Sequence, residues 1–390
     1  MVLKKFVKKN YIFSYFKSFI SLFIIYFKSR GNKKIIFFYF PVKAYYKNII
    51  EISKRLEKNK NFNIFLIYNT ESSELLSEYH NSYLLDFNLL KYLPFHGFML
   101  KHVILFFSSY VNYVFPPNSK NIYICHDIAD APMANNDIEA RLFLSLSKLD
   151  YIFLSSENVV NHFKNKFYQQ RKNLKNIPKL INTGYLKLDH VIKKLSKINS
   201  KKNQILIAPT FSKQMNKYNM SNYLIKIIEK LIKNGEKVIF RPHPLDLTKK
   251  GNLSNVNKII KIFNNFENFK IDKSVSYIDS YSNSKLLITD FSGTAYTYTY
   301  STLRPVIFFS KNEIKLRKSN NNELFYFKDR KNVGFICTKI NQLSKIIKKI
   351  DINKKILRSK IFKLRKKRIR YVNISVNKTV TEIMKIYYNL

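Results

Sequence analysis

A chain of 390 residues is too long for one ordinary hydrophobic core, and a hydrophobic content of 46% excludes a disordered chain. Cys125 and Cys337 lie far apart, which excludes a disulfide framework and a cysteine-based metal cluster and fits a reducing cytoplasm. The net charge of +45 leaves two explanations open: an anionic partner, or the Lys-, Asn- and Ile-rich composition typical of an AT-rich genome. No nucleic-acid partner is expected, because zinc-finger spacing, an RNP-like segment and a basic region with heptads are all missing.

The first thirty residues, 1–30, predict a helix on a membrane surface. An apolar run over 11–27 has lysines before it and Lys28 and Arg30 after it. At helical spacing its serines and Lys17 share one side, while its phenylalanines lie largely on the other. This pattern indicates a helix in the membrane interface, with docking on the protein's own core and a true span as alternatives. No cleavage site of small residues follows, so no cleavable signal peptide is expected.

From residue 33 the pattern changes to short apolar runs that alternate with amphipathic segments. Continuous apolar strands separated by helices predict a mostly parallel sheet covered on both faces. We therefore predict a first Rossmann-like α/β domain over 31–198. Its strands are expected at 35–40, 62–68, 102–107, 121–125 and 151–154, and its helices at 46–57, 138–149 and 158–167.

A polar stretch at 199–203 opens a second set of strands and helices, which predicts a second Rossmann-like domain over 199–340. This domain is expected to bind a donor substrate and to face the first domain across a cleft. The segment 341–390 is strongly basic and predicts helices that contact anionic lipid or simply present a solvated face. The second set has expected strands at 204–208, 237–240, 285–289 and 305–309, and expected helices at 222–233, 277–284 and 295–301.

Polar segments follow four of the predicted strands, at 125–127, 208–210, 241–244 and 289–294. Ligands of open α/β sheets bind at the carboxyl ends of the strands. The last segment is the sharpest, because Ser292, Gly293 and Thr294 stand between a strand and a helix, where free amides and the helix dipole attract anions. The alternative is a plain helix cap by Asp290 or Ser292.

Two histidines have a setting that suits chemistry. His243 lies between two prolines after Arg241, whose planar guanidinium matches a phosphate. His126 follows an apolar strand, with Asp127 and Asp130 nearby on the acceptor side, and could act as a general base on a hydroxyl. A surface turn and a structural histidine are the alternatives. Rossmann, Walker, serine-elbow and zinc signatures do not occur, so no metal or cofactor is firmly implied, and a divalent ion stays undecided.

The series Ala208-Pro209-Thr210-Phe211, Arg241-Pro242-His243-Pro244 and Ile288-Thr289-Asp290-Phe291-Ser292-Gly293-Thr294, followed by 304–309, resembles the CDP-glycerol glycerophosphotransferase family of teichoic-acid and capsule enzymes. The segment 184–189 is similar to the family's interdomain segment. The resemblance implies a GT-B fold and peripheral attachment to the cytoplasmic face of the cell membrane, on its anionic inner leaflet.

The resemblance also implies transfer of a polyol phosphate from a CDP-activated donor to a hydroxyl of a cell-surface glycan or lipid-linked acceptor. His126 and His243 would then be catalytic, and the donor phosphates would meet the set Thr210, Arg241, Asp290, Ser292, Gly293 and Thr294. A GT-B glycosyltransferase that uses a nucleotide sugar in capsule or lipooligosaccharide synthesis remains the alternative. A charge-driven scaffold is the third reading.

Overall fold

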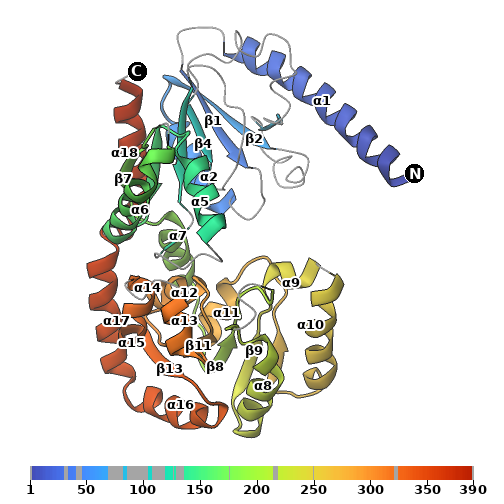
Figure 1. Ribbon diagram of the computed structural model, residues 1–390, viewed down its shortest axis with the longest axis vertical. Helices are drawn as coiled ribbons and strands as arrows, with labels where there is room; N and C mark the ends of the chain where they lie inside the picture. Colours follow the sequence, from blue (N-terminus) through green and yellow to red (C-terminus); the bar gives the residue numbers. More distant parts are fainter. Residues whose placement is uncertain are drawn as a thin grey trace. The chain divides into compact units, whose positions relative to one another are not determined.

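The computed structural model describes residues 2–29, 34–40, 46–68, 82–85, 104–107, 119–125, 127–128, 136–174, 176–213, 218–248, 250–319 and 324–388. The chain divides into two compact α/β units, drawn in Figure 1. Unit 1 comprises Met1–His126, Glu139–Lys187 and Ile374–Leu390, and unit 2 comprises Asp127–Ile138 and Leu188–Asn373. The end of the chain therefore returns to the unit in which the chain begins.

Unit 1 is built on a seven-stranded sheet in the order β3-β2-β1-β4-β5-β6-β7, in which every pairing is parallel. The chain enters the sheet at β1, adds β2 and β3 on one side and then β4 to β7 on the other, as in doubly wound folds. Both faces of such a sheet are covered, which explains the continuous apolar strands. The strands are β1 (Lys34–Phe40), β2 (Phe62–Tyr68), β3 (Ser82–Leu84), β4 (Ile104–Phe107), β5 (Lys120–Ile124), β6 (Tyr151–Leu154) and β7 (Lys179–Asn182).

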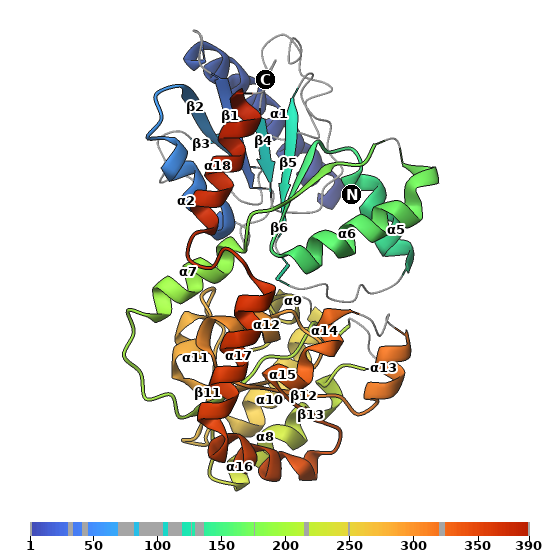
Figure 2. The ribbon, with the colours of Figure 1, turned by 90° about the vertical axis from the view of Figure 1, so that its left-hand side faces the viewer.

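The last helix of the chain, α18, completes the core of unit 1. Its Ile383 and Ile386 are buried in one cluster with Ile36, Phe38 and Leu66 of the sheet. Figure 2 shows α18 along the sheet beside α2. The helices described in the segments of unit 1 and at its borders are α1 (Val2–Lys28), α2 (Tyr46–Leu56), α5 (Asn136–Leu146), α6 (Glu157–Gln170), α7 (Leu186–Leu195) and α18 (Ser375–Tyr388).

Unit 2 contains a six-stranded parallel sheet in the order β10-β9-β8-β11-β12-β13. This is the Rossmann order, and the direction of winding reverses between β8 and β11. The strands are β8 (Gln204–Ile207), β9 (Lys237–Phe240), β10 (Phe269–Ile271), β11 (Ser284–Thr289), β12 (Val306–Phe309) and β13 (Gly334–Cys337).

Helices α8, α10 and α16 bury apolar side chains against the strands of unit 2 in one cluster, which includes Ile228, Ile259 and Ile347. The helices of this unit are α8 (Leu224–Lys233), α9 (Pro244–Thr248), α10 (Lys250–Phe263), α11 (Ile278–Asn283), α12 (Thr294–Thr302), α13 (Glu313–Ser319), α14 (Phe325–Lys328), α15 (Arg330–Val333), α16 (Leu343–Ile352) and α17 (Lys354–Arg368).

Helix α1 turns its serines inward and an aromatic stripe outward. Ser14, Ser18 and Ser21 are buried together with Leu22 and Ile25. Small side chains let the helix lie close to its neighbours, so the face that looks polar in the sequence is the packed one. None of the helices in the described ranges combines the length and the apolarity that a membrane span requires. The exposed stripe consists of Phe13, Phe16, Ile20, Ile24 and Phe27.

His162 on α6 gives unit 1 a pH-dependent stability. Its pKa is lowered to about 4, chiefly by burial and also by the charge of Lys166, while the charge of Glu139 opposes the shift. Because the folded pKa lies below the unfolded value, the unfolded chain takes up the proton first, and stability falls as the pH drops from about 6.5 toward 4. We expect unit 1 to lose about 3 kcal/mol over this range.

The measurement is chemical unfolding of unit 1 between pH 7 and pH 4, followed in wild type and in His162→Gln. The variant should lose most of the pH dependence, since glutamine does not titrate. An unchanged pH profile in the variant, or an NMR titration of His162 near its ordinary value, would contradict the prediction.

Candidate functional site

Three loops meet at the carboxyl edge of the sheet in unit 2. Strand β8 leads into 208–212, β9 into 241–246 and β11 into 290–294. Strands β8 and β11 are neighbours, and the winding reverses between them. A crevice at such a topological switch point is the usual ligand site of doubly wound sheets. The structure therefore brings the predicted donor-side segments 208–210, 241–244 and 290–294 to one edge.

The turn before α12 is open to a ligand. The Ser292 hydroxyl accepts a hydrogen bond from the Thr294 amide at 3.2 Å, directly before the helix. Gly293 is exposed, and a Cβ built on it would have no heavy atom within 4 Å. Its φ of −59° is available to any residue. Packing and backbone conformation therefore do not require a glycine here, while the helix start favours an anion.

Asp290 lies beneath this turn and is only 1% exposed. Its Oδ1 accepts hydrogen bonds from the amides of Thr210 and Phe291, and its Oδ2 from the amide of Met220, at 2.9 to 3.0 Å. Burial raises the pKa of Asp290, and the backbone hydrogen bonds act in the opposite direction. The carboxylate thus joins the loop after β8 to the turn, and its oxygens face backbone amides.

The imidazole of His243 lies at the same edge, at the end of β9. Its Nδ1 accepts a hydrogen bond from the Leu245 amide at 3.2 Å, and its ring lies 5.7 Å from that of Phe211. Burial lowers the pKa of His243, and the charge of Asp246 opposes the shift. A neutral imidazole that accepts at Nδ1 carries its proton on Nε2. His243 can therefore donate to a phosphate oxygen at neutral pH.

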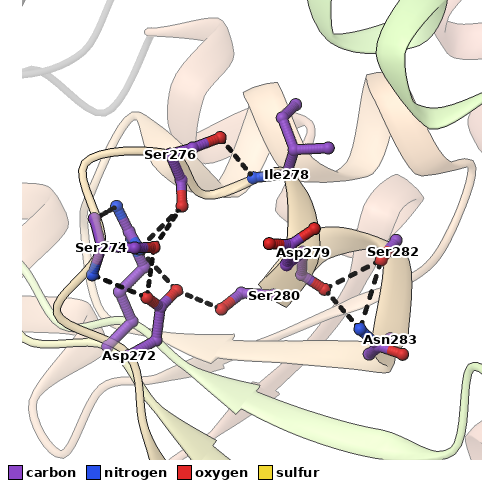
Figure 3. A network of polar contacts seen from close by, with 9 residues as sticks. Asp272, Ser274, Ser276, Ile278, Asp279, Ser280, Ser282 and Asn283 are labelled. Carbon is purple, nitrogen blue, oxygen red and sulfur yellow. Dashed lines mark hydrogen bonds and ion pairs between the residues drawn. The ribbon is translucent and has the colours of Figure 1, made fainter. Parts of the chain in front are cut away.

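Arg241 directs its guanidinium to the loop after β10. Its Nη1 pairs with the Asp272 carboxylate, and its Nη2 donates to the Ser274 carbonyl at 2.8 Å. Figure 3 shows Ser274 and Ser280 turned toward Asp272. Burial raises the pKa of Asp272, but the hydrogen bonds and the charge of Arg241 outweigh it and hold the pKa below its usual value. In this structure Arg241 orders 272–276.

Two cavities adjoin these loops. One of about 180 Å³ is lined by the loops after β8 and β9 together with α8 and α10, including Pro209, Ser212, Pro242 and Asp246. The other, of about 460 Å³, lies beside the Asp272 network and includes Lys270 and Asp279. In the first cavity the Asp246 carboxylate accepts a hydrogen bond from the Ser212 hydroxyl at 2.6 Å.

The predicted acceptor side is less well described. His126 and Asp130 lie outside the described residues, and Asp127 is half-buried next to the buried Ile128. Within the described ranges no group of three or more His, Cys, Asp or Glu side chains could hold a metal ion.

Two residues of the site carried no signal in the sequence. Arg330 and Tyr326 lie more than 30 residues beyond the turn, yet their side chains reach the carbonyls of Asp290 and Ser292. They stand in a segment that contains both apolar and charged residues, so their pattern does not differ from that of residues on a protein surface. Only their burial, at 0% exposed for both, distinguishes them.

Two Rossmann-like units, with an open helix start at the switch point of the second, define a protein of the GT-B class. The model of the CDP-glycerol:poly(glycerophosphate) glycerophosphotransferase family matches residues 20–385, and the chain belongs to this family. The family match confirms the resemblance seen in the sequence and the predicted transferase class.

Solved structures share the fold. The wall teichoic acid polymerase TagF, in a variant soaked with CDPG, is 17% identical with a TM-score of 0.62, and the match covers 98% of this chain and 96% of that chain. A second TagF structure is 18% identical with a TM-score of 0.61, over 91% and 90% of the two chains. The UDP-GlcNAc 2-epimerase of Methanocaldococcus jannaschii is 14% identical with a TM-score of 0.52, over 81% and 92%.

A curated relative, the DNA-directed RNA polymerase subunit beta' of Oedogonium cardiacum, is 28% identical over 289 residues, which are 69% of this chain. The matched region spans only 13% of that subunit's length. A match of this extent assigns no activity to the chain.

Proposed function

We propose that this chain transfers glycerol phosphate, or a related polyol phosphate, from a CDP-activated donor to a hydroxyl of a glycan or lipid-linked acceptor in teichoic-acid or capsule synthesis. The observation that carries the proposal is the open turn at Gly293, because an exposed glycine at a helix start on the switch point suits a diphosphate. The family match supports the same donor chemistry.

The acceptor hydroxyl attacks the β-phosphorus of the donor, the bond between this phosphorus and the bridging oxygen breaks, and CMP leaves. The amide of Gly293 and the hydroxyls of Ser292 and Thr294, with the Nε2–H of His243, stabilise the negative charge on the phosphates. Thr210 lines the same edge, and Asp290 and Arg241 hold the surrounding loops. His126 is proposed to take the proton of the acceptor, with Asp127 and Asp130 near it.

The test is a direct measurement of products. Purified protein is incubated with CDP-glycerol and a poly(glycerol phosphate) acceptor, and CMP release and acceptor extension are followed. Stoichiometric CMP and extended acceptor are expected, with tighter binding of CDP than of UDP. Turnover of a UDP-sugar with release of UDP would replace the proposal with a glycosyltransferase. Failure to bind any nucleotide would overturn the donor site.

The exposed stripe of α1 is proposed to place the protein on the inner leaflet of the cell membrane. Five apolar side chains at helical spacing share one outward face, and such a face enters the headgroup region of a bilayer. Exposed cations on α17 of unit 2, among them Lys355, Lys360 and Lys363, are proposed as a separate attraction to anionic lipid.

The double variant Phe16→Ser with Phe27→Ser is expected to lower partitioning onto anionic vesicles by about tenfold or more, since a buried phenyl group contributes ~1.5–3 kcal/mol. Cosedimentation with phosphatidylglycerol vesicles measures the effect. Tyr168→Ser is the matched control, because Tyr168 is exposed on α6. Equal binding by the double variant and the control would exclude α1 as the contact.

A further inference from the structure

The turn that is proposed to bind phosphate is held from below by two buried side chains. Nη2 of Arg330 donates to the carbonyl of Asp290 at 3.2 Å. The hydroxyl of Tyr326 lies 3.4 Å from the carbonyl of Ser292 and donates to it. The Ser292 carbonyl also accepts the amide of Ala295 at 3.1 Å. Two carbonyl groups of the turn are thereby fixed toward the interior of unit 2.

Both side chains are themselves fixed. Nη1 of Arg330 pairs with Oε2 of Glu313 at 2.8 Å, and its guanidinium lies 4.6 Å from the ring centre of Phe308 and 5.0 Å from that of Tyr326. The carbonyl of Tyr326 accepts the hydroxyl of Tyr296 at 2.6 Å. A guanidinium held by an ion pair and by aromatic faces keeps its planar fork in one orientation.

In a trans peptide the carbonyl and the following amide point in opposite directions. With the Ser292 carbonyl turned inward, the Gly293 amide points outward, at the exposed position where the phosphate is proposed to lie. We propose that Tyr326 and Arg330 are positioning residues for donor binding, which aim the amide of Gly293 at the donor phosphate. The inference rests on the proposed function.

The experiment compares Tyr326→Phe with Tyr298→Phe. Tyr298 is fully buried in α12. Its hydroxyl donates to the Ser284 carbonyl at 3.2 Å and accepts from the Ser284 hydroxyl at 3.1 Å, so the control loses buried hydrogen bonds away from the turn. Both variants should lower the melting temperature of unit 2, and the control should lower it at least as much as Tyr326→Phe does. Only Tyr326→Phe should weaken CDP binding in calorimetry, by about three- to tenfold, the range for one hydrogen bond.

With CDP-glycerol as substrate, Tyr326→Phe should raise KM or lower kcat, whereas Tyr298→Phe should leave both unchanged. Arg330→Lys keeps the charge and loses the fork, so it should weaken CDP binding further. If Arg330→Lys does not fold, the comparison of Tyr326→Phe with Tyr298→Phe still tests the inference. Wild-type affinity in Tyr326→Phe would overturn the inference and leave the proposed function standing. No CDP binding by wild type would overturn both.

Discussion

Replacing Gly293 with aspartate is expected to weaken CDP binding at least about 100-fold. The position is exposed at the start of α12, next to the amides proposed to hold the donor phosphate. A carboxylate about 4 Å from a phosphate costs about 4 kcal/mol at an effective dielectric constant of 20. The side chain also occupies open space beside the turn, where the phosphate is proposed to lie, since a Cβ at Gly293 meets no heavy atom within 4 Å apart from its chain neighbours.

The same substitution should not destabilise unit 2. The φ of −59° at Gly293 is helical, and an added Cβ would meet no heavy atom within 4 Å apart from its chain neighbours. An acidic residue in the first turn of a helix contributes about 0.3–1 kcal/mol through the helix dipole. Aspartate is therefore expected to leave the melting temperature unchanged or to raise it. Loss of binding without loss of stability separates a ligand position from a structural one.

Two matched variants complete the measurement, which is calorimetric titration with CDP at low salt. Gly293→Asn has nearly the size of aspartate without its charge and should lose far less affinity. Gly293→Ala tests the close approach of the phosphate alone, and we expect a smaller loss combined with a gain in stability. Equal affinity of the aspartate and asparagine variants would show that no phosphate lies near this turn.

Most strands could be predicted because they lie inside the sheets. Continuous apolar runs mark β2, β6 and β9, whose bounds match the prediction at both ends. The strands that the prediction omitted, β3, β7, β10 and β13, are the outer strands of the two sheets. An outer strand has a neighbour on one side only and includes polar or small residues, as in Lys179–Asn182 and Gly334–Cys337. Its apolar signal is therefore too short to recognise.

The donor edge was predictable for a different reason. A polar segment directly after an apolar strand lies at the carboxyl edge whatever the rest of the fold does, and parallel neighbours bring such segments together. Side-chain directions do not follow from this argument. Arg241 turns to Asp272, which is adjacent to it in space. The sequence does not show this contact, because Asp272 is 31 residues away along the chain. For the same reason the burial of the serines of α1 could not be predicted, since the periodicity of a helix does not show which of its faces packs against the rest of the protein.

Replacing Asp290 with asparagine is expected to destabilise unit 2 by about 3 kcal/mol. The buried carboxylate accepts three backbone amides, from Thr210, Met220 and Phe291. Asparagine keeps the shape but offers one acceptor oxygen, so its NH₂ group must face at least one amide that also donates. A buried donor left without an acceptor costs about 1–3 kcal/mol, and the charge-assisted character of the other bonds is lost as well.

Urea unfolding of unit 2 measures this loss, and Asp279→Asn is the control, because Asp279 is an exposed carboxylate in the first turn of α11. The control should change the free energy of unfolding by less than about 1 kcal/mol. A loss of CDP affinity in Asp290→Asn is expected as well, since freeing the loop after β8 moves Phe211 away from His243. An asparagine variant as stable as wild type would mean that Asp290 does not hold this edge together.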